Sequence, residues 1–66
     1  MEKFEPSLLV SRRMANGLSQ RALSRKAGLA QSVIAELERG KHPPSENALA
    51  KLAQALGIDP RELFTS

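Results

Sequence analysis

Apolar residues recur at helical spacing along almost the whole chain, and this pattern predicts short helices rather than strands. No segment alternates cleanly between apolar and polar residues, and the β-branched residues that favour strands are scarce. Each of the four glycines, at positions 17, 28, 40 and 57, follows a helical stretch, where a residue at positive φ commonly closes a helix. We therefore predict an all-α fold.

Capping residues divide this pattern into five short helices. Ser19 and Ser45 are good N-caps for the second and fourth helices. Asp59, Pro60 and Glu62 supply a cap, a first-turn proline and a capping-box glutamate for the last one. The expected bounds are about 6–16, 20–26, 30–39, 45–57 and 59–64. Sixty-six residues predict a single domain (1–66) with a small core, and residues 1–5 are expected to fray.

The composition argues against several classes of function. There is no cysteine, so disulfides and thiolate metal sites are not available, and the single histidine, His42, cannot build a zinc site alone. His42 stands in a proline-bounded loop, where we expect a solvated residue. Because no paired carboxylates accompany it, we expect neither an enzyme nor a cofactor. No apolar run approaches the roughly 20 residues of a membrane span, and the lack of cysteine fits a cytoplasmic protein.

The charge balance of the chain is mildly positive. Ten Lys and Arg against seven Asp and Glu give a net charge of +3 and a pI of about 10.0, which is compatible with a phosphate-bearing partner. Aromatic residues make up only 3% of the chain, which argues against proteins that stack single-stranded bases on aromatic side chains. The charge therefore permits a nucleic-acid partner without indicating one by itself.

The most informative span is SQRALSRKAGLAQSVIAELERG, residues 19–40. It contains two short helices joined through Gly28 by a tight turn, which describes a helix-turn-helix over about residues 19–39. The second helix of such a motif can enter the major groove of DNA. The apolar residues that the motif would bury are Leu23, Ala27, Leu29, Ile34 and Leu37.

This span opens with Leu18-Ser19-Gln20 and closes with Leu37-Glu38-Arg39-Gly40, and it is followed by Pro44-Ser45 and by an Ala53-x-x-Leu56-Gly57 pattern. In this combination the chain, over about residues 8–64, resembles the Xre family of phage-repressor and Cro-like helix-turn-helix domains. The resemblance implies a five-helix, lambda-repressor-like bundle that binds DNA, is often dimeric and regulates transcription.

Two positions depart from the pattern of that family. Ser24 stands where alanine is most frequent, and a serine is small enough to fit there. Ala30 stands where a side chain that caps the helix and touches DNA is common.

A helical wheel separates the faces of the third helix. With Ile34 at the centre of the buried face, Glu38 lies about 40° away, at the margin of the core. The opposite face carries small and hydrogen-bonding side chains, which suit a helix that sits close to base edges. Gln can pair with adenine, and Glu can accept from cytosine N4. The predicted base-contacting residues are Gln31, Ser32, Ala35 and Glu36.

Glu38 and the nearby cations receive other roles. A charge at the margin of the core calls for a partner, and the resemblance implies that Arg13 of the first helix forms an ion pair with Glu38. The resemblance also implies that Gln20 is a phosphate clamp, at a helix start whose N–H groups favour anions. Arg39 and Lys41 follow the recognition helix. The predicted phosphate contacts are Arg13, Gln20, Arg39 and Lys41.

Two functional hypotheses follow from the sequence. The leading one is a sequence-specific binder of double-stranded DNA that represses transcription as a homodimer on a palindromic operator, with no small-molecule effector evident. The alternative is an antitoxin- or coactivator-like module that uses the same bundle to bind another protein. Arg12, Arg21 and Arg25 do not discriminate between them, since DNA contact and a solubilising surface explain these residues equally well.

Overall fold

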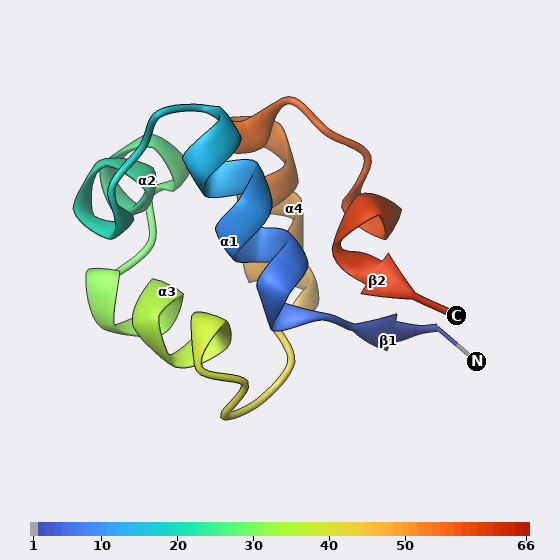
Figure 1. Cartoon of the computed structure of the whole chain (residues 1–66). Coiled ribbons are helices and arrows are strands. Elements are labelled where there is room, and N and C mark those ends of the chain that lie inside the picture. The colour runs from blue at the N-terminus through green and yellow to red at the C-terminus, as the bar shows by residue number, and fades with distance from the viewer. Residues whose placement is uncertain (1) are drawn as a thin grey trace.

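The computed structural model describes residues 2–66, and within them four α-helices pack around one apolar core (Figure 1). A 3-10 helix and a two-stranded antiparallel sheet complete the described part of the chain. No helix in residues 2–66 is long and apolar enough to cross a membrane. The α-helices are α1 (Pro6–Ala15), α2 (Gln20–Ala27), α3 (Gln31–Glu38) and α4 (Glu46–Leu56). The shorter elements are β1 (Lys3–Phe4), η1 (Pro60–Leu63) and β2 (Phe64–Thr65).

Local hydrogen bonds explain where α2 and α4 begin. The Ser19 hydroxyl accepts from the backbone N–H of Ala22 at 3.0 Å, and the Ser45 hydroxyl accepts from that of Ala48 at 3.1 Å. Each bond satisfies a donor that has no partner inside its own helix. The four predicted α-helices 6–16, 20–26, 30–39 and 45–57 therefore agree with the structure to within one or two residues at each end.

The core draws on every helix. Burial of each large apolar side chain contributes about 1.5–3 kcal/mol, so even a few such residues matter in a chain of this length. Because these residues come from all four α-helices and η1, the core fixes the position of each helix relative to the others. The fully buried side chains are Leu9, Leu23, Ile34, Leu37, Leu52 and Leu63.

The prediction of five helices is wrong at the C-terminal end. Residues 60–63 form a single 3-10 turn, in which the N–H of Glu62 bonds to the carbonyl of Asp59 at 2.9 Å. The predicted capping box is present, since Asp59 accepts from the backbone of the turn and Glu62 accepts from the N–H of Asp59 at 2.9 Å. The turn stops there because Phe64 is extended (φ −121°, ψ 152°) and pairs with β1.

The expected fraying of residues 1–5 and the absence of strands are also incorrect. Residue 1 lies outside the described residues, but β1 pairs with β2 in the register Phe4 to Phe64, and Figure 1 shows the two strands side by side. The Phe4 and Phe64 rings meet edge to face at 6.0 Å, and Phe4 is buried. The N–H of Glu5 bonds to the carbonyl of Leu63 at 2.9 Å. Pairing with the other end of the chain thus holds this segment in place.

Candidate nucleic-acid interface

The α2–α3 unit has the geometry of a helix-turn-helix. Gly28 closes α2 in the left-handed region (φ 71°, ψ 34°), which only a residue without Cβ adopts freely. The N–H of Leu29 then bonds to the carbonyl of Ser24 at 2.9 Å. After an extended Ala30, α3 begins at Gln31, so only three residues separate the two helices. In Figure 1, α3 lies at one corner of the molecule, below α2.

The two faces of α3 divide as the wheel predicts. Ile34 and Leu37 are fully buried, whereas Gln31 and Ser32 are exposed at the start of the helix. Ala35 is partly exposed on the outer side. The outer face is therefore short, mostly uncharged and accessible, which allows close approach to another surface.

The N-terminus of α3 also remains available to a ligand. Ala30 is the N-cap and its side chain makes no capping hydrogen bond. Among the described residues, no side chain of the N-cap therefore accepts from the first backbone N–H groups of the helix. Such groups attract acceptors and anions.

Arg13, Gln20 and Glu38 form one hydrogen-bonded cluster that joins three helices. Arg13 Nε donates to Glu38 Oε2 at 2.7 Å, and Arg13 Nη2 donates to Glu38 Oε1 at 3.2 Å. Gln20 Nε2 donates to the same Oε1 at 2.9 Å, and Arg13 Nη1 donates to the carbonyl of Leu18 at 2.8 Å. The side chains of Arg13 and Glu38 are only 15% and 7% exposed. The cluster therefore fixes the end of α3 against α1 and the start of α2.

This cluster changes what its members can offer to a ligand. Arg13 donates three hydrogen bonds to Glu38 and Leu18 and is largely covered, which leaves little of its guanidinium free to bind a phosphate. Gln20 uses one amide N–H for Glu38 and keeps a second one, because a side-chain amide has two donors. Gln20 also stands first in α2, after the N-cap Ser19. Of the two, Gln20 is the better placed for a phosphate.

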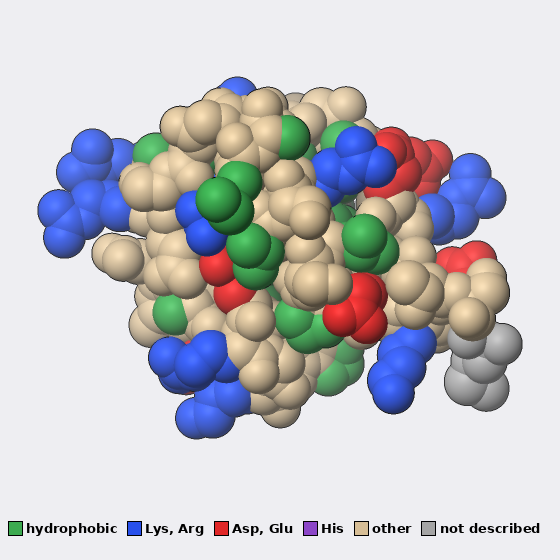
Figure 2. Space-filling model, in the orientation of Figure 1, with side chains coloured by type: hydrophobic (Ala, Val, Ile, Leu, Met, Phe, Trp, Pro, Cys, Tyr) green, Lys and Arg blue, Asp and Glu red, His purple; other side chains and the backbone are tan. Residues whose placement is uncertain are grey.

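Cations surround the helix-turn-helix without forming one continuous patch. Arg39 and Lys41 are exposed directly after α3, and Arg21 and Arg25 are exposed on α2. Figure 2 shows Lys and Arg side chains scattered over the visible face, many of them at its margin, with acidic side chains between them. A negatively charged partner would therefore meet separate cations rather than one continuous positive surface.

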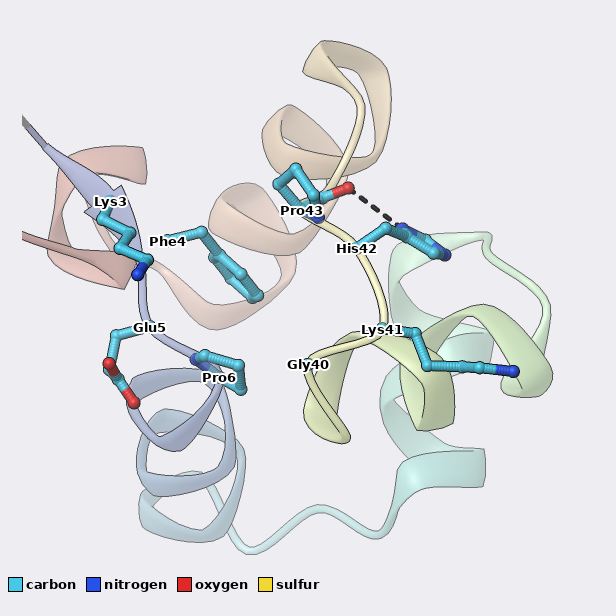
Figure 3. A pocket seen from close by; sticks show the side chains of 8 residues that line it. All are labelled: Lys3, Phe4, Glu5, Pro6, Gly40, Lys41, His42 and Pro43. Atoms are coloured by element: carbon cyan, nitrogen blue, oxygen red, sulfur yellow. Dashed lines mark hydrogen bonds between the residues drawn. The ribbon is translucent and has the colours of Figure 1, made fainter.

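One neighbour of the predicted site was missed by the sequence reasoning. His42 Nε2 lies 3.3 Å from Glu36 Oε1, and their side chains are 50% and 38% exposed. His42 is in the loop between α3 and α4, beside a surface hollow of about 460 Å³ that β1 and this loop line (Figure 3). The loop begins at Gly40 and brings residue 42 back to the last turn of α3. The sequence pattern alone does not show which way the loop turns.

Ser24 fits its position as expected. The residue is buried, and its hydroxyl donates to the carbonyl of Arg21 at 2.7 Å. Throughout residues 2–66, each buried side-chain nitrogen or oxygen has a hydrogen-bond partner. The same residues contain no group of three or more His, Cys, Asp and Glu side chains that could hold a metal ion.

Comparison with known proteins places this geometry in a family. A family model described as Helix-turn-helix matches residues 9–63. The chain belongs to this Xre-like helix-turn-helix family. DNA-binding transcription regulation is therefore its function in the coarse sense, and the expected absence of enzymatic activity is in keeping with a family of regulators.

Individual relatives support the assignment. The chain is 37% identical over 65 residues to the uncharacterized HTH-type transcriptional regulator y4dJ of Sinorhizobium fredii, covering 98% of this chain and 84% of that protein. It is 43% identical over 47 residues to the uncharacterized HTH-type transcriptional regulator y4dL of the same organism. That match covers 24% of the y4dL protein. Among solved structures, it is similar to the restriction-modification controller protein C.AhdI from Aeromonas hydrophila, at 44% identity and a TM-score of 0.84 over 89% of each chain.

Proposed function

We propose that this Xre-like protein binds double-stranded DNA sequence-specifically through α3 and represses transcription as a homodimer on a palindromic operator. The observation that carries the proposal is the outer face of α3. It exposes Gln31 and Ser32 beside Glu36, while Ile34 and Leu37 anchor the opposite face in the core. Direct readout needs such side chains on a helix that can enter a major groove.

The proposed base contacts are Gln31, Ser32, Ala35 and Glu36. The Gln31 amide can donate to and accept from adenine, and the Glu36 carboxylate can accept from cytosine N4. Ser32 adds a small hydroxyl, and Ala35 offers a methyl group that can contact thymine. No bulky side chain on this face would hold the helix away from the groove.

The proposed phosphate contacts lie around that face. Gln20 offers its free amide N–H and the N-terminus of α2, while Arg39 and Lys41 offer exposed cations directly after α3. Arg13 takes part chiefly by holding Glu38 in position, and Gln20 donates to the same carboxylate. Such contacts orient the protein on the duplex without reading its sequence.

The dimensions of the molecule fit a dimer with adjacent half-sites. Recognition helices of a two-fold dimer lie about 34–36 Å apart, one turn of DNA. The molecule measures 31 × 21 × 19 Å along its principal axes. Two copies spaced by one turn of DNA can therefore approach each other only when their long axes lie along the DNA, whereas two turns would leave them apart in any orientation.

The decisive experiment is selection of bound duplexes from a random pool, followed by sequencing. We expect the enriched duplexes to be palindromic, with half-sites one turn of DNA apart. Gln31→Ala and Glu36→Ala should each reduce the free-energy difference between the preferred base and its competitors at one position by about 1–3 kcal/mol. Lys41→Ala should weaken binding to all duplexes alike and lower the slope of log K against log salt by about 1.

The rival hypothesis, a protein-binding module on the same fold, predicts a different outcome. Selection would then enrich no sequence, and Gln31→Ala and Glu36→Ala would leave any DNA binding unchanged. Arg61→Ala, in η1 away from α2 and α3, serves as a control for general loss of positive charge, since its side chain is 79% exposed. Equal binding to every duplex, insensitive to salt, would contradict the DNA-binding proposal.

A further inference from the structure

The two ring nitrogens of His42 both face atoms that can only accept hydrogen bonds. Nδ1 lies 3.0 Å from the backbone carbonyl oxygen of Pro43, drawn as a dashed line in Figure 3. Nε2 lies 3.3 Å from Oε1 of Glu36. A neutral imidazole carries one N–H and leaves its other nitrogen as an acceptor, whereas the imidazolium carries two. The protonated ring is therefore the form that satisfies both contacts.

From this geometry we propose that protonated His42 positions Glu36 for base recognition and makes DNA binding sensitive to pH. The inference rests on the proposed function, in which Glu36 belongs to the DNA-reading face of α3. It adds a residue outside the helix-turn-helix span 19–39 to the groups that determine specificity. His42 would act through Glu36, and so it is a positioning residue rather than a base contact.

Pairing with His42 would help Glu36 in two ways. The contact occupies Oε1 and leaves Oε2 as the free acceptor for cytosine N4, so the carboxylate is oriented before DNA arrives. The positive ring also offsets the repulsion between the Glu36 carboxylate and the DNA phosphates. A glutamate on a DNA-reading face otherwise opposes approach to every duplex, whatever its sequence.

The charged groups around His42 determine the direction of the pH effect. Lys41 opposes protonation of the ring, whereas Glu36 favours it. Lys3 and Glu5 line the hollow on the other side of the loop, and the ring points away from that hollow in Figure 3. Hydrogen bonding to the Pro43 carbonyl, and then to Glu36, raises the pKa of His42 above its ordinary value of 6.5. The contact is therefore complete below pH 6.5 and is lost as the pH rises through the raised pKa.

The test compares the pH dependence of binding in three variants. A duplex selected by the wild-type protein from a random pool near pH 6 is titrated from about pH 5.5 to about pH 8.5 at constant ionic strength. We expect wild-type affinity to fall by up to about tenfold per pH unit across the titration of His42, the limit for one linked proton. His42→Gln should bind weakly with a flat profile, and His42→Arg tightly with a flat profile. Glu36→Gln should flatten the profile and remove the preference for cytosine.

Base preference separates a positioning role from a general charge effect. Selection repeated with His42→Gln should lose enrichment for cytosine at the Glu36 position while the position read by Gln31 is unchanged. Arg39→Gln, which removes an exposed cation of the same region, should weaken binding but keep both the pH profile and the cytosine preference. Circular dichroism confirms that each variant is folded.

Two results would overturn the proposal. The first is a His42→Gln protein with the pH profile and the cytosine preference of the wild type. The second is an NMR titration in which Glu36→Gln leaves the pKa of His42 unchanged, because the pair would then not exist in solution. If the wild-type protein enriches no duplex at any pH, the proposed function itself fails. A His42 pKa that still responds to Glu36→Gln would then show that the pair exists without a role in DNA binding.

Discussion

Removal of either partner from the Arg13–Glu38 pair should strongly destabilise the protein. The two side chains are 15% and 7% exposed and are joined by two hydrogen bonds. Loss of one partner of a buried pair leaves an uncompensated charge, which costs about 3–5 kcal/mol. Because Gln20 still donates to Glu38 in Arg13→Ala, and the pair is not completely buried, we expect about 3 kcal/mol for each single variant.

The double variant distinguishes a pair from two independent charges. Arg13→Ala/Glu38→Ala should lose less than the sum of the single losses, with a coupling of about 1–3 kcal/mol. A matched control exists one residue away, where Arg12 forms a 2.8 Å ion pair with Glu62 at side-chain exposures of 42% and 39%. Solvent screens the Arg12–Glu62 pair, so the same comparison of single and double alanine variants should give a coupling of about 0–1 kcal/mol for it.

Urea unfolding followed by circular dichroism measures these differences in the free energy of unfolding. A chain of this length has a total stability of about 3–10 kcal/mol, so a single alanine variant can lose most of it. Glu38→Gln is the milder variant, because its amide oxygen still accepts from Arg13 or from Gln20. Single losses that add to the double loss, or equal couplings in the two cycles, would refute the assignment of Arg13–Glu38 as a structural pair.

Three further predictions concern stability. Leu52→Ala, at a fully buried position, should lower the free energy of unfolding by about 2–5 kcal/mol, whereas Met14→Ala, at 65% exposure, should change it little in the same urea titration. Ser19→Ala removes the cap of α2 and should cost about 1 kcal/mol by thermal unfolding. Hydrogen bonds from the side chain and then the backbone of Arg61 lower the pKa of Asp59. The contribution of the ionised Asp59 carboxylate to the free energy of unfolding is thus fully present above pH 3.8 and is lost as the pH falls through the lowered pKa. Asp59→Asn should remove this part of the pH dependence when unfolding is measured at a series of acidic pH values.

The helices were predictable because their signals are local. A serine at the N-cap needs only the N–H three residues ahead, as at Ser19 and Ser45, and a glycine closes a helix through its own φ, as at Gly57 (67°). The buried side of α3 was predictable for a similar reason, because helical periodicity places Ile34 and Leu37 on one side of the helix.

The features that the sequence did not predict depend on contacts between distant segments. A two-residue strand is too short to show alternation, and Phe4 becomes part of one because Phe64 lies opposite it, sixty positions along the chain. The same pairing explains why residues 60–63 stop after one turn. Capping signals at Asp59 correctly indicated that a turn begins, but the chain beyond Leu63 is directed by β1.

In the candidate site, too, the sequence did not predict a contact between distant segments, and the example is Gln20. The Gln20 amide donates to Glu38 Oε1 at 2.9 Å, and the same oxygen accepts from Arg13 Nη2. Under the proposed function, a phosphate bound by Gln20 would therefore be linked through one carboxylate oxygen to the end of α3. Helix position and phosphate contact are then not separate properties of the protein. Glu38→Gln should consequently change DNA affinity as well as stability, although the Glu38 side chain is only 7% exposed.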